Sequence, residues 1–389
     1  MLGIFHPFSI FRWVLAVSVV GFGLSTCAMA PRIAYTEQQA RSAQLSGFDR
    51  IRVYADADPE KFKPASEWKP QALQRELNIL CISGGGAGGA FTAGILNAWT
   101  ARGDRPNFDV VTGVSTGALI APFAFLGPQY DHSLEVLYTG GGAEQLVDVN
   151  WRAGAIFGSS LLTGHALRSL VDSYVTTDLL EAVAAEHRKG RRLFVMTTNL
   201  DSQRAVIWNM GAIAASERPD AATLFKNVLL ASASIPGIFP AVMIKATSKG
   251  GTIEEMHSDG GTSDQFFSLP DKAMLASGSL PSGVKKLHFY IIVNNALIPE
   301  FAVVKNGILP VTTRAYAILV KSQTKEALLA LYNYSIRSGF DFNVASIDEQ
   351  VPYSPLNPFD TVYMSKIFDL GMRRTEDEEL WHDRPDFSP

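Results

Sequence analysis

LNILCISGGGAGGAFTAGILNAWT, residues 77–100, is the stretch of sequence that decides the fold. Residues 77–83 form a short apolar run, which is typical of a strand buried in a parallel sheet. A glycine-rich turn follows, and residues 89–100 predict a helix. The same order returns at once, because residues 108–114 predict a second strand and residues 116–126 a second helix. Two strand–turn–helix units in succession predict an α/β domain with a mostly parallel sheet.

The segments around this stretch extend the same pattern. A capping box from Asp178 to Glu181 predicts the start of a helix that runs to about residue 188. Residues 31–69 are mixed and polar, and we expect them to wrap or tether the domain, with regular structure beginning only after them. The charged tail from Arg373 predicts a frayed end. Further strands are predicted at residues 193–200, 205–209 and 286–293, with a turn at 201–204, and further helices at 221–233, 312–337 and 360–372.

The composition sets the size of the fold and excludes several functions. The 389 residues are 47% hydrophobic and 19% charged, which is ample for one large domain with extensions or for two modest domains. A net charge of -4 without a basic run gives no reason to expect nucleic acid. Two cysteines can build neither a disulfide framework nor a cysteine-rich zinc site. We divide the chain into a signal peptide at 1–27, an N-terminal extension at 28–76, a main α/β domain at 77–275, and a C-terminal part at 276–389 that completes the sheet and adds helices.

The N-terminus predicts export. Residues 13–24, WVLAVSVVGFGL, have the length of a signal-peptide core and fall short of the roughly 20 apolar residues that span a bilayer. Two cleavage sites compete. Leu-Ser-Thr-Cys at 24–27 resembles a bacterial lipobox, although threonine is uncommon before the cysteine, and Ala-Met-Ala at 28–30 stands directly before a proline. An uncleaved anchor helix is the third interpretation. We expect a cell-envelope protein that is lipid-anchored through Cys27, or otherwise periplasmic or secreted, and we expect Cys81 to be a buried, inert thiol.

The glycine-rich turn after the first strand reads Ser-Gly-Gly-Gly-Ala-Gly-Gly, residues 83–89. Such a turn brings backbone amides close to a ligand at a helix N-terminus. By itself the motif is compatible with a dinucleotide loop, a phosphate loop or a tight turn. A Walker loop is excluded because no Gly-Lys-Ser/Thr follows. Neither Asp104 nor Asp109 suits a dinucleotide-binding fold, which needs an acidic residue at the end of the second strand.

A second turn, Gly-Val-Ser-Thr-Gly at 113–117, again joins a strand to a helix. Small residues beside Ser115 permit the strained nucleophile elbow that exposes a serine hydroxyl. Both turns would lie at the carboxyl ends of strands in one sheet, the edge at which open α/β sheets bind ligands. Amides of the first turn could then bind the oxyanion that forms when Ser115 attacks a carbonyl. The alternative is two glycine-rich turns with no shared task.

A nucleophilic serine needs a base. Of the seven histidines, only His382 is late enough in the chain for a histidine-dependent α/β-hydrolase, and it lies in a polar tail. His288 lies inside an apolar strand, where a core histidine is the simpler explanation. Asp259, in Met-His-Ser-Asp-Gly-Gly at 256–261, offers another base, because an ionised carboxylate beside Ser115 can take its proton. A plain Asx turn explains the same Asp-Gly pair equally well.

The three motifs, taken together and in this order, resemble the signature of patatin-like phospholipases and lipid acyl hydrolases. Ala-Ser-Ala-Ser-Ile-Pro-Gly-Ile-Phe-Pro at 231–240 also resembles the segment that often precedes the aspartate of that family. The resemblance covers about residues 77–267, roughly half of the chain. It implies a three-layer α/β/α patatin-like domain with a mostly parallel central sheet, and it makes residues 77–275 the catalytic domain.

The resemblance also implies roles for individual residues. Ser115 would be the nucleophile and Asp259 the base of a Ser–Asp dyad at the strand ends, and Gly85 and Gly86 would donate oxyanion amides. One residue departs from the family, because the usual arginine or lysine of the glycine turn is Gly88 here. The absence of this cation would change how an anionic head group is bound, and it leaves the backbone amide donors unaffected. The motif glycines are Gly84, Gly89, Gly113, Gly117, Gly260 and Gly261.

The activity implied by the resemblance is that of a serine acyl hydrolase. It would cleave carboxylic esters of lipids at a membrane surface, in the manner of a phospholipase A or lysophospholipase, without a metal or organic cofactor. Acyl transfer to an alcohol other than water stays open. A histidine-dependent esterase, a nucleotide-binding module and a catalytically silent surface lipoprotein are the alternatives. A set of apolar residues forms either a rim that accepts an acyl chain or ordinary core: Trp151, Phe157, Leu161 and Leu162.

Overall fold

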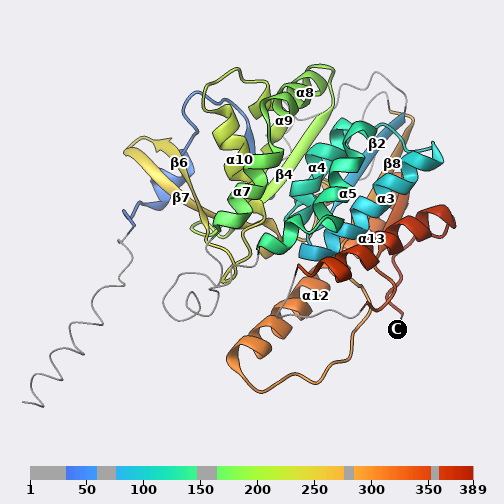
Figure 1. Ribbon diagram of the computed structural model, residues 1–389. Helices are drawn as coiled ribbons and strands as arrows, with labels where there is room; N and C mark the ends of the chain where they lie inside the picture. The colour runs from blue at the N-terminus through green and yellow to red at the C-terminus, as the bar shows by residue number, and fades with distance from the viewer. Residues whose placement is uncertain (1–31, 59–75, 147–163, 276–283, 352–358, 389) are drawn as a thin grey trace, which may run out of the picture.

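The computed structural model describes residues 32–58, 76–146, 164–275, 284–351 and 359–388, which form three layers around a central sheet (Figure 1). The predicted signal peptide and Cys27 lie outside the described residues, and export and lipidation stay predictions. The predicted rim residues Trp151, Phe157, Leu161 and Leu162 lie outside them as well. Within the described ranges, no helix is both long enough and apolar enough to span a bilayer.

One mixed sheet forms the middle layer. Its nine described strands are β1 (Arg52–Tyr54), β2 (Glu76–Ile82), β3 (Val110–Val114), β4 (Arg192–Asn199), β5 (Arg204–Asn209), β6 (Val242–Ser248), β7 (Gly251–Asp259), β8 (Lys286–Val293) and β9 (Asp341–Ser346). Their order is β1-β5-β4-β3-β2-β8-β9, with β7 pairing to both β4 and β6. The five strands from β4 to β9 in this order are parallel, and every pairing that involves β1, β5, β6 or β7 is antiparallel.

Helices cover both faces of this sheet. The described helices are α2 (Glu37–Ser42), α3 (Gly89–Arg102), α4 (Thr116–Leu126), α5 (Asp131–Thr139), α7 (His165–Tyr174), α8 (Thr177–Arg188), α9 (Met210–Ala214), α10 (Ala221–Ser232), α11 (Asp271–Leu275), α12 (Ile308–Ser338) and α13 (Thr361–Glu376). Short 3-10 turns lie at η2 (Gly86–Gly88), η3 (Pro128–Tyr130), η4 (Gly142–Leu146) and η5 (Gly260–Thr262).

The two faces are built from alternate residues of the same strands, because successive side chains of a strand point to opposite sides. Leu80 and Ile82 of β2 belong to the core under α3, α4, α10 and α13. Ile79 and Cys81 belong to the second core, where Leu328 of α12 covers them. Each fully buried leucine or isoleucine of this kind stabilises the fold by roughly 1.5–3 kcal/mol. The α/β/α architecture expected from the sequence is therefore confirmed.

Most elements lie where the sequence predicts them. The helix at 116–126 and the strand at 286–293 match residue for residue, as α4 and β8. The predicted pair of strands around the turn at 201–204 forms as β4 and β5, and the long helix at 312–337 forms as α12 with one extra turn at its start.

The cap predicted for α8 is wrong. The helix begins at Thr177, and its N-cap is Thr176, whose side chain accepts a hydrogen bond from the Leu179 amide. Asp178 already lies inside the first turn, where its carboxylate favours the positive end of the helix dipole instead of capping it. Both Thr176 and Asp178 of the sequence Thr-Thr-Asp at 176–178 are residue types suited to an N-cap, and the extended backbone at Thr176 decides between them.

Thr176→Ala is expected to lower the free energy of unfolding by about 1 kcal/mol, because one amide of the first turn loses its acceptor. Glu181→Ala removes the partner of the capping box expected from the sequence, and it should change stability by less than about 0.5 kcal/mol at this exposed position. Urea unfolding followed by circular dichroism measures both. An equal loss in the two variants would contradict the observed cap.

Regular structure also begins earlier and ends later than expected. The polar extension supplies α2 and the edge strand β1, which pairs with β5. The charged tail is held in place at least as far as His382, contrary to the expected fraying: α13 continues to Glu376, and the His382 and Val344 backbones exchange two hydrogen bonds of 2.9 Å. The Trp381 ring lies 5.0 Å from the Trp99 ring, between ring centroids. Aromatic packing therefore holds a tail whose charge alone favoured disorder.

Candidate active site

Ser115 sits in a strained turn between β3 and α4. Its backbone adopts φ 56° and ψ −124°, a region that residues with a side chain rarely occupy. Strain of this kind persists only where the surroundings enforce it, and it is common at catalytic positions. Gly117 makes the turn possible, since a Cβ there would lie 2.3 Å from the Ile82 carbonyl oxygen at the end of β2. The elbow predicted from the sequence is thus present in the backbone.

Strand register brings Asp259 to this serine. The last residue of β3, Val114, pairs with Met196 of β4. The next residue of β4, Thr197, pairs with Asp259 at the end of β7. β7 therefore takes the place beside β4 that β3 leaves, and the two side chains meet across 144 residues of sequence.

The contact between the two side chains is short and buried. The Ser115 hydroxyl donates to Asp259 Oδ2 at 2.5 Å, and the two residues are 6% and 2% exposed. The other carboxylate oxygen, Oδ1, accepts the Gly261 amide at 2.7 Å. Asp259 therefore forms the Asx turn and the serine contact at the same time, one with each oxygen.

Burial changes the acidity of Asp259. Desolvation raises the pKa of its carboxyl to about 7, and the hydrogen bonds from Ser115 and from the Gly261 amide oppose that rise. A general base works best when its pKa lies near the working pH. The site therefore holds a carboxylate of suitable basicity in hydrogen-bond contact with a serine hydroxyl.

Ser232, at the end of α10, holds the turn at Ser115 in place. Its hydroxyl accepts the Ser115 amide at 3.0 Å and donates to the Met196 carbonyl at 2.7 Å. The following loop adds a second link, because the Asp259 amide donates to the Ser234 carbonyl at 2.9 Å. The resemblance of residues 231–240 to the family segment does not predict these roles, because nothing in the local sequence of a single serine signals them.

The glycine turn is fixed from β8. The Asn294 amide donates to the Ser83 hydroxyl and the Asn294 side chain to the Ser83 carbonyl, both at 2.9 Å. The Gly84 amide donates to the Gln265 carbonyl at 3.1 Å. The amides of Gly85 and Gly86 have no hydrogen-bond acceptor in the part of the chain that the structure describes. These are the two amides that the sequence pointed to as oxyanion donors. Asn294 was missed, because it lies one residue past the predicted strand.

An apolar cavity opens from Ser115 under the helices. Beside Ser115, Gly86 and Thr116 it is lined almost entirely by aliphatic and aromatic side chains. A second apolar cavity adjoins it and shares Leu119, Leu137 and Leu170 with the first. The remaining lining residues of the first cavity are Tyr138, Ala143, Leu146, Leu167, Ala233, Ile235, Phe239 and Phe359.

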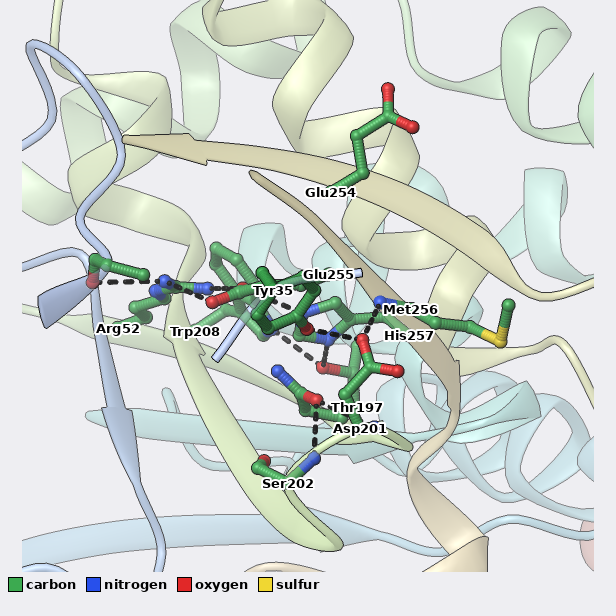
Figure 2. A network of polar contacts seen from close by, with 12 residues as sticks. Tyr35, Arg52, Thr197, Asp201, Ser202, Trp208, Glu254, Glu255, Met256 and His257 are labelled. Atoms are coloured by element: carbon green, nitrogen blue, oxygen red, sulfur yellow. Dashed lines mark hydrogen bonds and ion pairs between the residues drawn. The ribbon is translucent and has the colours of Figure 1, made fainter. Parts of the chain in front are cut away.

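A buried polar network anchors β7 just before Asp259 (Figure 2). The Glu255 carboxylate accepts a hydrogen bond from Arg52 of β1, and it lies 3.3 Å from His257 Nε2. Glu255 and His257 are each at most 1% exposed. Thr197 joins them, with its hydroxyl 2.9 Å from His257 Nδ1 and 2.8 Å from the Trp208 indole nitrogen that donates to it. Burial lowers the pKa of His257. Its contacts to Thr197 and Glu255 make this histidine part of the support of the strand.

A second cluster ties the N-terminal extension to the same strand (Figure 2). The Asp201 carboxylate accepts from Arg32 at 2.7 Å, from the Tyr35 hydroxyl at 2.5 Å and from the Met256 amide at 3.0 Å. Desolvation tends to raise the pKa of Asp201, yet these donors outweigh it and hold the pKa at about 2. The strand that ends in Asp259 is therefore clamped from two sides.

The histidines considered as bases lie elsewhere. His382 pairs with β9, three strands from β3 in the sheet, and His288 Nδ1 lies 2.9 Å from the Asp341 carboxylate. Among the described residues, no histidine is hydrogen-bonded to Ser115. Cys81 is fully buried, and burial raises the pKa of its thiol to about 12, in keeping with an inert core residue.

Part of the chain is similar to known proteins. The model of the patatin-like phospholipase family matches residues 80–267. A patatin-like phospholipase domain-containing protein of Meyerozyma guilliermondii is 31% identical over 185 residues, which are 45% of this chain and 24% of that protein. The chain thus spans about a quarter of the length of this relative.

Two solved structures show a weaker likeness. VipD from Legionella pneumophila is 13% identical with a TM-score of 0.37, over 78% of this chain and 67% of that one. The type III effector protein ExoU is 12% identical with a TM-score of 0.30, over 79% and 54%. The glycine turn, the serine elbow and the buried aspartate all lie inside the stretch that the family model matches. Through residues 80–267, the chain belongs to the patatin-like phospholipase family.

Proposed function

We propose that the protein is a lipid acyl hydrolase that cleaves carboxylic esters through an acyl-enzyme on Ser115, with Asp259 as the base. The observation that carries the proposal is the 2.5 Å contact of these two buried side chains at a strained turn, beside an apolar cavity. A serine hydroxyl becomes a nucleophile when a positioned base takes its proton. No other described side chain is hydrogen-bonded to the Ser115 hydroxyl.

In the first step, Ser115 Oγ attacks the ester carbonyl while Asp259 accepts its proton. The carbonyl oxygen becomes an oxyanion, and the amides of Gly85 and Gly86 are the donors available for it. Removing one such donor costs an enzyme about 100- to 1000-fold in rate. The tetrahedral intermediate collapses, Asp259 returns the proton to the alcohol, and the alcohol leaves an acyl-serine behind.

In the second step, water takes the place of the alcohol. Asp259 removes a proton from the water as it attacks the acyl-serine, and the same two amides stabilise the second oxyanion. Collapse expels Ser115 Oγ, which regains its proton from Asp259, and frees the carboxylic acid. Attack by another alcohol would give acyl transfer by the same route.

The cavity indicates the kind of acid released. Its aliphatic and aromatic lining suits a hydrocarbon chain, and the adjoining cavity that shares Leu119, Leu137 and Leu170 would extend the space for it. A phospholipid or lysophospholipid meets this description, as the name of the family suggests. Gly88, in the position of the family's usual cation, argues against recognition of an anionic head group at that point of the turn.

Hydrolysis of a soluble short-chain ester and labelling by a fluorophosphonate test the proposal directly. Wild-type protein should turn over the ester and carry the label on Ser115, and Ser115→Ala should lose both, with the rate falling at least about 1000-fold. Ser234→Ala is the matched control, because this buried serine keeps its backbone contact to Asp259. Full activity in Ser115→Ala, or labelling of another serine, would contradict the proposal.

A further inference from the structure

The surface formed by the described residues carries one concentration of exposed apolar side chains. Of the thirteen large apolar side chains exposed among the described residues, seven fall between Phe301 and Leu319. Phe301 is 93% exposed, Ile308 90% and Val303 86%. Single exposed apolar residues are ordinary, but a contiguous group marks a surface that binds something.

Three of the seven lie in the loop before α12 and four lie on α12 itself, a helix that is apolar on two sides. The C-terminal half of α12 buries Leu328 and Leu331 against the sheet. The N-terminal half exposes Ile308, Val311 and Ile318, whose spacing of three and seven residues places them on one side of the helix. A helix that is apolar on both sides is normally covered on both. Here the second side has no cover in the described part of the protein, and Figure 1 shows this half of α12 projecting from the body with the loop before it.

The projecting half lies at the edge of the sheet that carries the proposed active site. β8 is parallel to β2 and β3, so the chain leaves β8 for α12 at the same edge at which Ser115 follows β3. Contacts continue from the helix to the site. Gln323 of α12 accepts from Gln265 at 3.4 Å, and Gln265 donates to the Gly261 carbonyl beside Asp259 at 2.6 Å. Tyr316 of α12 lies within one helix turn of the exposed Ile318, and burial together with the charge of Asp259 raises the pKa of this tyrosine. The exposed half of the helix is therefore close to the site.

The segment is also positively charged, on a chain whose net charge is -4. Between Phe301 and Lys325 the sequence has four cations and no aspartate or glutamate. Lys321 is neutralised by Glu300 at 3.0 Å, while Lys305 is exposed. An apolar face flanked by lysine and arginine suits a bilayer with anionic lipids, which attracts the cations and accepts the apolar side chains.

We propose that the docking face, which consists of the loop from Phe301 and the exposed side of α12 to Leu319, seats the protein on an anionic phospholipid bilayer. The choice of a bilayer as the partner rests on the proposed lipid hydrolysis, and the docking itself is measured without catalysis. In this arrangement the strand edge that bears Ser115 faces the lipid.

Fluorescence quenching tests the docking face at a single position. In the full chain with Cys27→Ser, Ile318→Cys is labelled with an environment-sensitive dye, and vesicles of phosphatidylcholine and phosphatidylglycerol carry spin-labelled lipid as the quencher. Ile336→Cys is the matched control, being 64% exposed against 59% for Ile318 and lying on the same side of α12. The two positions are five helix turns apart, or about 27 Å. We expect quenching at 318 and not at 336, whereas equal quenching at both, or none at 318, overturns the proposal.

A charge variant separates docking from chemistry. Ile308→Asp combined with Leu319→Asp should weaken vesicle binding of the Cys27→Ser chain by about tenfold or more and leave hydrolysis of a soluble short-chain ester unchanged. If wild type hydrolyses no ester but the 318 probe is quenched, the proposed function fails and the docking stands. If the ester is hydrolysed and the probe is not quenched, the docking alone fails. A change of oligomeric state with unaltered vesicle binding would assign the face to a second copy and overturn the bilayer.

Discussion

Asp259→Asn is expected to lower kcat/KM for a soluble ester by about 1000-fold, with Ser115 still in its elbow. The amide cannot accept the proton of the serine, and a positioned general base is worth about 100- to 10,000-fold. Ester hydrolysis measures the loss, and Ser234→Ala is again the control. Retention of more than about a tenth of the rate would mean that another group is the base.

The pH dependence of the wild type follows from the same carboxyl. The base must be ionised, and burial raises its pKa to about 7, so kcat/KM should rise with pH through about 7 and then level off. An ordinary, solvated aspartate would give a plateau from about pH 5 upward. A profile that is flat between pH 5 and 8 would therefore contradict the burial of the charge as the cause.

The raised pKa of Asp259 also makes the stability of the fold depend on pH. Between about pH 4 and 7 the carboxyl of Asp259 ionises in the unfolded chain but stays protonated in the fold, so its contribution to stability is complete below about pH 4 and is lost as the pH rises through about 7. The full shift corresponds to about 4 kcal/mol at most. Asp259→Asn, which does not titrate, should thus be more stable than wild type at pH 8 by a margin that shrinks toward pH 4, as urea unfolding can measure.

Gly88→Arg, which restores the cation usual in the family, is expected to destabilise this protein by about 3 kcal/mol or more. A Cβ at Gly88 would lie 2.1 Å from the Asn294 carbonyl oxygen, and this is backbone that cannot swing aside. Moving it would disturb the two bonds from Asn294 to Ser83 that fix the glycine turn. Hydrolysis should fall together with stability, since the amides of Gly85 and Gly86 belong to the same turn.

Gly142→Arg is the control for this prediction. It adds the same side chain at a glycine whose Cβ would have no heavy atom within 4 Å, in ordinary backbone conformation. Urea unfolding and ester hydrolysis should be close to wild type for this variant. If Gly88→Arg is as stable and active as Gly142→Arg, the end of β8 can retreat, and the absent cation is a matter of head-group choice alone.

Local sequence was sufficient for the parts of the site that are local. The elbow at Ser115 follows from small neighbours between a strand and a helix, and the glycine turn follows from its composition. The pairing of Ser115 with Asp259 does not follow from either segment. It depends on β7 joining β4 where β3 stops, a register that no short motif encodes, and the ordered resemblance to a family supplied it.

The parts that were missed depend on contacts between distant segments. Strands β6 and β7 form a hairpin around Lys249 and Gly250, and the alternation of apolar and polar residues along them could have been recognised. Strand β1 is only three residues long, which is too short for a clear pattern. Ser232 and Asn294 act through single hydrogen bonds to a turn that is remote in sequence. The tail from Arg373 was predicted to fray because its charges favour solvation, whereas in the structure Trp381 packs against Trp99 of α3.

The position of that tail has a consequence for solubility. β9 is the last strand of the sheet, and an uncovered last strand presents unpaired amides and carbonyls to which another chain can add. The backbone of His382 occupies such groups at Val344, so the tail closes part of an aggregation-prone edge. At the opposite end, the brevity of β1 limits the same hazard. An affinity tag fused after this tail would therefore adjoin the segment that covers part of this edge.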